Sequence, residues 1–159
     1  TEEYGISSFV FRSRRPFHPR RLSDALDMSL SDGLFAGVLR SKGLAWIASK
    51  NDWAYAWSQA GCSLRLDPAG YWWSCAPSDQ WPEAQDEIDR IQAEYSGLYE
   101  DRRQELVFIG RSMDELAVRE VLNRCLLTDL EFVQGPDVWQ AFKDPFPAIE
   151  LQEDIESDA

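Results

Sequence analysis

The stretch Phe9–Leu22 (FVFRSRRPFHPRRL) constrains the fold more than any other part of this sequence, because an extended apolar segment runs directly into a helix start. Pro19 is expected to be the first residue of that helix. The backbone N–H at this position has no partner within a helix, so its absence in proline costs no hydrogen bond, and the φ of proline is already helical. Apolar residues at helical spacing follow, and a Ser-Asp-Gly turn at 31–33 ends them. The chain therefore begins with a strand, which we expect in the interior of a sheet, and a helix that can pack on that sheet.

Two arginines, Arg20 and Arg21, open the expected helix. Positive charge is unfavourable at a helix N-terminus, where the peptide dipoles and the free N–H groups favour an anion. We therefore expect a negative group close to this cluster. Two alternatives are open: an internal carboxylate, or a phosphate or acidic surface of a partner.

Segments with strand character follow this helix. The first is Val38–Ala48, in which Gly43 is expected to be a bulge or a point of close packing. Large rings then alternate with small residues in Trp53–Ser58, and a turn leads to a similar alternation in Cys62–Leu66. These segments predict an antiparallel meander.

The second half of the chain predicts helices around one more strand. A helix is expected from Trp81 to about Ser96, and the continuous apolar run Leu106–Ile109 is typical of a buried strand near the centre of a sheet. Sequences of the capping-box type begin at Ser112 and at Thr128, and each predicts a helix start. Pro136 is expected to begin a last helical turn.

The order of these elements predicts an α+β fold. We expect a two-layer sandwich with a mainly antiparallel sheet and its helices on one face, partly resembling the split β-α-β (ferredoxin-like) plan. A main domain at 4–129 is expected to be followed by a helical extension at 130–147. Residues 148–159 are acidic and carry few apolar side chains, so a disordered tail is expected there.

Charge and cysteine usage narrow the classes of function. The net charge of −12 disfavours nucleic acids and acidic membrane surfaces as partners, because binding phosphate groups requires lysines and arginines. No apolar run approaches the roughly 20 residues of a membrane-spanning helix. The three cysteines are widely spaced and odd in number, which indicates neither a disulfide framework nor a zinc knuckle and fits a reducing compartment. We expect a cytoplasmic protein.

Five short motifs resemble one family in the same order along the chain. They are RRPFHP (14–19), LRSKGLAW (39–46), WSQAG (57–61), RRQELVFIG (102–110) and CLLTD (125–129). On these residues, about Tyr4–Asp129 resembles the C-terminal domain of the CobW family. This family consists of P-loop GTPases and includes proteins of cobalamin synthesis, zinc metallochaperones and nitrile hydratase activators.

The resemblance implies a role within a larger protein. It implies a non-catalytic accessory domain of a GTP-dependent metallochaperone for zinc or cobalt, with a link to cobalamin synthesis as one form of that role. Its partners would be the cognate N-terminal GTPase domain, expected upstream of Thr1, and a metal-receiving client protein. GTP, Mg and zinc or cobalt would belong to the parent protein, and no cofactor is expected in this domain. The residues themselves show no nucleophile–base pair and no phosphate-binding loop, so we expect no enzymatic activity here.

Charged side chains are the first candidates for contacting the GTPase domain or the client. The alternative for the arginines among them is an internal ion-pair network, since several acidic residues lie in the same motifs. The candidates are Arg12, Arg14, Arg15, Arg20, Arg21, Lys42, Arg102 and Arg103.

Three other residue types are candidate sites. His18 could bind a metal, but it is the only histidine in the chain, and a helix-capping or hydrogen-bonded role is favoured. All three cysteines are expected to be small core side chains. Trp72 and Trp73 cannot both point inward from a regular strand, so one of them is a candidate interaction surface. Exposed aromatic side chains leave a second function open, an independent small-molecule or protein-binding module.

Overall fold

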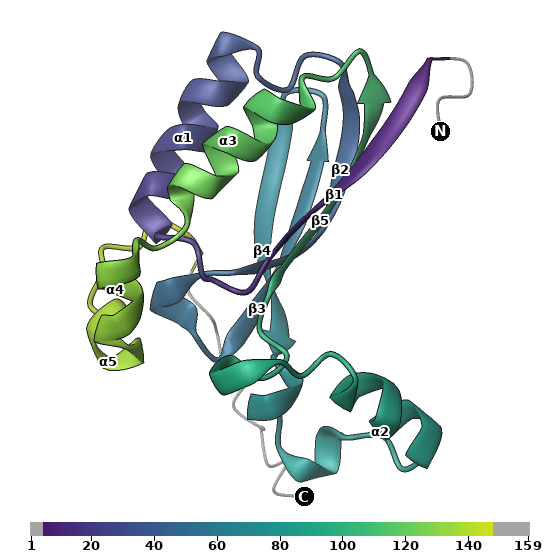
Figure 1. The fold of residues 1–159 in the computed structure, drawn as a ribbon, viewed down its shortest axis with the longest axis vertical. Helices are drawn as coiled ribbons and strands as arrows, with labels where there is room; N and C mark the ends of the chain where they lie inside the picture. The colour runs from purple at the N-terminus through teal and green to yellow at the C-terminus, as the bar shows by residue number, and fades with distance from the viewer. Residues whose placement is uncertain (1–4, 148–159) are drawn as a thin grey trace, which may run out of the picture.

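A computed structural model describes residues 5–147, apart from the side chains of residues 30 and 31 (Figure 1). Five strands form one sheet in the order β1-β5-β2-β3-β4, and every neighbouring pair is antiparallel. The predicted α+β fold with a mainly antiparallel sheet is therefore confirmed. The strands are β1 (Ile6–Ser13), β2 (Val38–Trp46), β3 (Trp53–Ala60), β4 (Ser63–Tyr71) and β5 (Gln104–Arg111).

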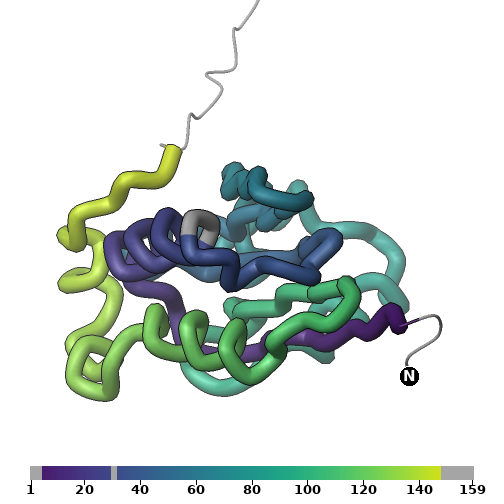
Figure 2. Tube along the Cα trace, turned by 90° about the horizontal axis from the view of Figure 1, so that it is seen from above, coloured from purple at the N-terminus to yellow at the C-terminus, as the bar shows by residue number. Residues whose placement is uncertain are grey.

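Two long helices lie side by side on one face of this sheet (Figures 1 and 2). They are α1 (Pro19–Asp32), between the first two strands, and α3 (Glu115–Cys125), after the last. An excursion between β4 and β5 contains the short helix α2 (Gln85–Gln92), and the chain after α3 forms α4 (Asp129–Gln134) and α5 (Pro136–Trp139). Single 3-10 turns complete the fold: η1 (Ala48–Lys50), η2 (Trp73–Cys75), η3 (Ser78–Gln80) and η4 (Gly97–Tyr99).

Most helix boundaries follow from local chemistry. Pro19 is the first residue of α1, and α1 ends at Gly33, whose φ of 77° lies in the left-handed region that glycine adopts most easily. Thr128 forms a complete capping box at the start of α4, as predicted. The capping box predicted at Ser112 is wrong, because Asp114 is the N-cap of α3 and accepts a hydrogen bond from the backbone N–H of Ala117.

Two other expectations are corrected. The first strand was expected inside the sheet, but β1 is an edge strand, and its exposed residues Ser8 and Arg12 fit that position. The helix expected from Trp81 to about Ser96 is shorter, since α2 spans only Gln85–Gln92. Trp81 itself is extended (φ −72°, ψ 145°), which is the conformation that a following proline favours.

Two clusters of buried side chains hold the elements together. The first lies between the sheet and the helices, where Phe11, Trp57 and Phe108 meet α1 and α3. The second lies on the opposite face at one end of the sheet and contains Trp46 and Trp139. Because fully buried Trp139 belongs to α5, the helical extension is packed into the fold. The acidic tail expected at 148–159 lies outside the described residues.

Gly43 is a point of close packing, as predicted. A β-carbon at this position would lie 1.8 Å from the backbone oxygen of Glu105, so no larger residue fits unless β2 and β5 separate. This contact brings β5 against β2 in the interior of the sheet. The close contact at Gly43 thereby fixes the position of β5, whose central run Leu106–Ile109 is apolar on both faces.

Candidate functional site

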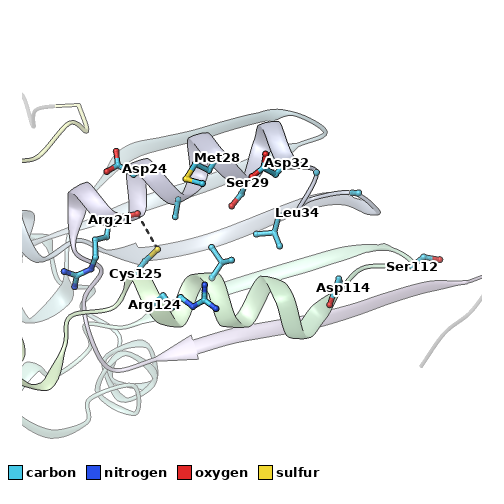
Figure 3. A pocket seen from close by; sticks show the side chains of 14 residues that line it. Arg21, Asp24, Met28, Ser29, Asp32, Leu34, Ser112, Asp114, Arg124 and Cys125 are labelled. Carbon is cyan, nitrogen blue, oxygen red and sulfur yellow. Dashed lines mark hydrogen bonds between the residues drawn. The ribbon is translucent and has the colours of Figure 1, made fainter.

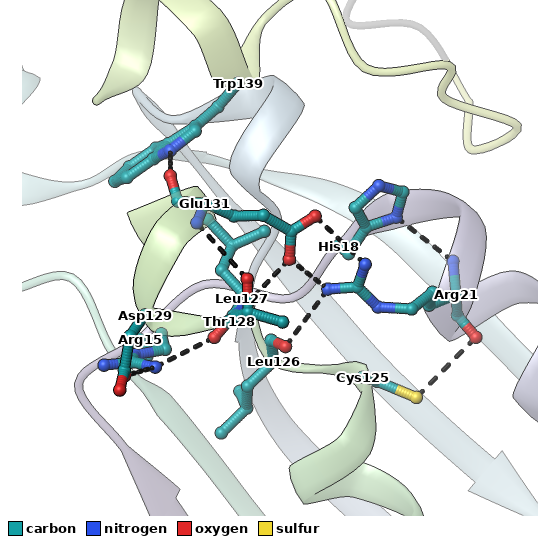
Figure 4. A network of polar contacts seen from close by, with 10 residues as sticks. All are labelled: Arg15, His18, Arg21, Cys125, Leu126, Leu127, Thr128, Asp129, Glu131 and Trp139. Carbon is teal, nitrogen blue, oxygen red and sulfur yellow. Dashed lines mark hydrogen bonds and ion pairs between the residues drawn. The ribbon is translucent and has the colours of Figure 1, made fainter. Parts of the chain in front are cut away.

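Arg21, in the first turn of α1, and Arg15, just before this helix, meet carboxylates of α4 (Figure 4). Arg21 donates to both carboxylate oxygens of Glu131, with N–O distances of 2.5 and 3.0 Å. Arg15 donates to the Asp129 carboxylate at 2.7 Å and to the backbone oxygen of Leu127 at 3.0 Å. Of the two alternatives for the expected anion, the internal carboxylate is confirmed.

Glu131 connects three helices through this network. Its hydrogen bond with Arg21, with further help from Thr128, lowers its pKa to about 2, although partial burial opposes the shift. Its backbone oxygen accepts a hydrogen bond of 2.7 Å from the Trp139 indole. Glu131 is therefore a fixed anion that joins α1, α4 and α5, and it has no proton to donate near neutral pH.

His18 caps α1, as its position in the sequence predicted. Its Nδ1 accepts a hydrogen bond of 3.2 Å from the backbone N–H of Arg21, and its ring stacks on Phe142 with 4.8 Å between ring centroids. Burial, together with the Arg21 charge, lowers its pKa, so the imidazole is neutral near pH 7. Among the residues that the structure describes, no three His, Cys, Asp or Glu side chains gather where they could hold a metal ion.

A second set of polar contacts attaches the excursion between β4 and β5 to the sheet. Buried Arg102 donates to the backbone oxygen of Asn51 at 2.6 Å and to the Asp52 carboxylate at 3.3 Å. Arg102 also contacts the sulfur of Cys75 at 2.8 Å, yet burial outweighs this charge and raises the pKa of the thiol. The Asp101 carboxylate accepts hydrogen bonds from the backbone N–H groups at the start of η2.

The remaining predicted arginines share two glutamates. Glu94 lies 3.8 Å from Arg14 and 3.6 Å from Arg103, and Glu105 lies 3.3 Å from both Arg12 and Arg103. Together with an Arg20–Asp24 pair on α1, these contacts give an internal carboxylate to every predicted contact arginine. A contact with another domain stays a prediction for these residues, and internal pairing is the observed state.

The two adjacent tryptophans behave as expected for a pair that cannot both point inward. Trp72 is 2% exposed and packs in the second cluster, whereas Trp73 is 38% exposed. The ring of Trp73 meets Trp81 edge to face with 5.6 Å between centroids. Trp73 remains a candidate interaction residue, and Trp72 is a core residue in the described structure.

A groove that was not predicted from the sequence lies between α1 and α3 (Figure 3). Its volume is about 660 Å³, and its lining includes the apolar side chains of Ala25, Met28, Leu34 and Val121. Met28 is 65% exposed, and an outward methionine on an amphipathic helix is the signal that could have indicated the groove. The arrangement can accommodate an apolar group, but it presents no cluster of reactive side chains.

The three cysteines differ from one another. Cys125 is buried at the groove, where its thiol contacts the backbone oxygen of Arg21 at 3.6 Å, and burial raises its pKa to about 11. Burial therefore keeps Cys125 as a protonated thiol, the less reactive form, near neutral pH. The core position predicted for all three is confirmed for Cys125 and wrong for Cys62, which is exposed in the turn between β3 and β4. Cys75 is half-buried.

Lys42 lies on the sheet face opposite α1 and α3, and unlike the predicted arginines it forms no ion pair among the described residues. It pairs across the strands with Val107 of β5 and Ser58 of β3, so the three residues share one face. Glu105 belongs to the same face, two positions before Val107, and it pairs with Arg12 and Arg103. The other neighbours of Lys42 on this face, apart from Ser58, are apolar or basic, and we call them, together with Lys42, the open sheet patch. The patch consists of Leu39, Arg40, Lys42, Val107, Ile109 and Arg111.

Comparison with known proteins assigns the chain to a family. Residues 6–126 match the family described as "Cobalamin synthesis protein cobW C-terminal domain". The chain belongs to this CobW C-terminal domain family. The match covers all five strands and both long helices, so the resemblance stated from the short motifs is confirmed.

Two relatives of this CobW C-terminal domain carry descriptive names. Zinc-regulated GTPase metalloprotein activator 1 of Dictyostelium discoideum is 41% identical over 157 residues, which is 98% of this chain and 32% of the relative. A zinc chaperone of Mycobacterium tuberculosis is 33% identical over 143 residues, 89% of this chain and 34% of the relative. The chain thus spans about a third of the length of these relatives.

A solved structure supports the fold. The CobW C-terminal domain described here resembles part of the Zn(II)-bound YjiA GTPase from E. coli, with a TM-score of 0.51 and 19% identity. The similarity covers 76% of this chain and 30% of that protein. In the part of the chain that the structure describes, no helix is long and apolar enough to cross a membrane.

Proposed function

We propose that this domain is the non-catalytic accessory domain of a GTP-dependent zinc metallochaperone, and that it couples the nucleotide state of a GTPase domain to delivery of the metal to a client protein. The observation that carries the proposal is the family match, together with 41% identity to a protein named as a zinc-regulated GTPase metalloprotein activator. Zinc is favoured over cobalt because both descriptively named relatives are zinc proteins. GTP, Mg and the metal would be bound elsewhere in the full-length protein.

The chemistry of the domain supports a role in contact rather than catalysis. Glu131 is held as an anion by Arg21, His18 is held as a neutral helix cap, and Cys125 is held as a thiol. None of these groups is free to transfer a proton or bind a metal without breaking the network. Coupling to nucleotide would therefore act through surfaces that contact the GTPase domain differently in its GTP and GDP states. A cytoplasmic location is part of this proposal.

The test compares the full-length protein with a form that ends before this domain. GTP hydrolysis and zinc transfer to a client are measured in both forms. We expect loss of the domain to change the rate of nucleotide-stimulated zinc transfer by at least about tenfold, the size of a typical coupling between sites. Equal hydrolysis and equal transfer in the two forms would contradict the proposal.

A second candidate is an independent binding module, which the groove between α1 and α3 and the exposed ring of Trp73 favour. Calorimetry of the 159-residue chain against GTP, GDP, zinc, cobalt and cobalamin precursors separates the two candidates. The accessory role predicts no tight binding by the domain alone. Micromolar or tighter binding of one of these ligands would favour the independent module.

A further inference from the structure

The central run of β5, Leu106–Ile109, is apolar on both faces, but the structure covers only one of these faces along the whole run. Leu106 and Phe108 are fully buried in the cluster beneath α1 and α3. Val107 and Ile109 point to the other face, and Val107 is 37% exposed although it lies in an interior strand. An antiparallel sheet with one solvated face normally carries polar residues there. The open face is therefore a candidate for a surface that a partner covers.

The second cluster covers only one end of that face. Trp46 and Ala54 lie beneath Trp72 and Trp139, and the open sheet patch begins beyond them. Leu39, at the bulge of β2, adds a second exposed aliphatic side chain, with 54% of its surface exposed. Figure 1 shows α1 and α3 on one side of this part of the sheet and no described helix on the other.

Basic side chains that form no ion pair among the described residues surround these aliphatic side chains. Twelve of the 16 lysines and arginines form ion pairs within the described residues. The other four are Arg40, Lys42, Arg111 and Lys143, and the first three belong to the open sheet patch. In a chain with a net charge of −12, basic side chains that lie together on one face and have no ion pair in the described part of the chain favour an acidic protein surface as the partner.

We propose that the open sheet patch is the docking surface for a carboxylate-bearing, apolar-centred surface of the GTPase domain in the same polypeptide. This inference rests on the proposed function, because that function supplies the GTPase domain. Leu39 and Val107 form the dry centre of the contact, and Arg40, Lys42 and Arg111 pair with carboxylates at its rim. The rim charges set the orientation of the two domains, and the aliphatic centre supplies the burial.

The position of the patch suits a partner in the same chain. Ile6, at the start of β1, pairs directly with Arg111, so a domain joined ahead of Gly5 would reach the sheet beside the patch. Relatives are about three times as long as this chain, which provides for such a domain. A covalent tether raises the effective concentration of the two surfaces to about the millimolar range, so a modest contact area suffices.

Zero-length carbodiimide cross-linking of the full-length protein tests this surface, because it joins an amine only to a carboxylate in contact. This domain has only three lysines, so every cross-link from it has a clear origin. Lys50, 2.9 Å from Asp144, provides an internal positive control. Lys143 is exposed and, like Lys42, has no ion pair among the described residues, which makes it the matched comparison.

We expect Lys42 to be joined to an Asp or Glu of the GTPase domain, with a yield at least about fivefold above that of Lys143, since only Lys42 faces a complementary charged surface. Peptide mass spectrometry identifies the carboxylate. Equal yields for the two lysines would overturn the proposal. So would cross-links from Lys42 only to a second copy of the protein or to a client.

Charge reversal sharpens the test. Arg40→Glu with Arg111→Glu should lower the Lys42 cross-link at least about fivefold, because like charges would then face each other at the rim. Arg90→Glu with Arg124→Glu, on α2 and α3 outside the patch, should leave it unchanged, and an equal loss in both double variants would overturn the proposal. GTP hydrolysis in the same proteins separates the two proposals. If Lys42 forms the cross-link but the Arg40→Glu, Arg111→Glu variant hydrolyses GTP and transfers zinc like the wild type, the docking surface is supported and the coupling function is contradicted. If this variant changes hydrolysis or transfer but the wild type forms no Lys42 cross-link, the coupling function is supported and the docking surface is contradicted.

Discussion

Replacing Glu131 with glutamine removes the charge that Arg21 holds and keeps the shape of the side chain. The pKa of Glu131 falls from 4.5 to about 2 in the folded chain, chiefly through its hydrogen bond with Arg21. Because one pKa unit is 1.36 kcal/mol, the full shift would correspond to about 3.4 kcal/mol of folding free energy. The side chain of Glu131 is 22% exposed and that of Arg21 is 37% exposed, so solvent screening reduces this stabilisation to about 1–2 kcal/mol.

The sign of the pH dependence follows from the direction of the shift. Since the folded pKa is lower than the unfolded one, the ionised carboxylate stabilises the fold fully above the unfolded value, 4.5, and this stabilisation is lost as the pH falls toward about 2. We expect the difference in unfolding free energy between wild type and Glu131→Gln to be complete at pH 7. At about pH 3 more than half of it should be lost, because the unfolded carboxyl is then mostly protonated.

Urea unfolding followed by tryptophan fluorescence, in a double-mutant cycle with Arg21→Gln, measures this coupling at both pH values. The cycle removes the effect of other titrating carboxylates, which occur in all four proteins. A coupling energy of about 1–2 kcal/mol at pH 7 is expected. A coupling energy that is the same at both pH values, or below about 0.3 kcal/mol at pH 7, would refute the assignment of Glu131 as the anion that secures α1.

Three further substitutions or modifications test the described packing. Trp139→Ala should lower the unfolding free energy by about 3–5 kcal/mol, whereas Val138→Ala, at an exposed neighbour, should change it by less than about 1 kcal/mol; equal urea midpoints would contradict the docking of α5. His18→Ala should cost about 1 kcal/mol and His18→Asn much less, because asparagine also caps helices; similar losses in both would argue against the cap. Iodoacetamide at pH 7.5 should label Cys62 well before Cys125, as read by peptide mass spectrometry, and comparable rates would contradict the burial of Cys125.

Features decided within a few residues could be predicted from the sequence. Pro19 begins α1 and Thr128 caps α4 because both signals act on adjacent backbone groups. The apolar run Leu106–Ile109 indicated an interior strand, and β5 lies between β1 and β2. The family could also be recognised, since its motifs are short and contiguous.

Features that depend on distant residues could not be predicted. Arg21 and Glu131 are 110 positions apart, and no local signal states that these two charges meet. The sequence reasoning therefore grouped Lys42 with the arginines as one contact surface. The strand register instead places Lys42 opposite Val107 and Ser58, where it forms no ion pair among the described residues. The interior position predicted for β1 was wrong for a similar reason, since the sequence of an apolar strand does not distinguish the edge of a sheet from its interior.

Lysine acylation of the full-length protein in its GTP-bound and GDP-bound states tests the central claim most directly. The claim is that this domain contacts the GTPase domain through the open sheet patch in a way that depends on nucleotide. The rate of acetylation of Lys42, relative to that of Lys143, should differ between the two states by at least about twofold, because a change of contact changes the exposure of only one of them. The same ratio in both states would contradict the account.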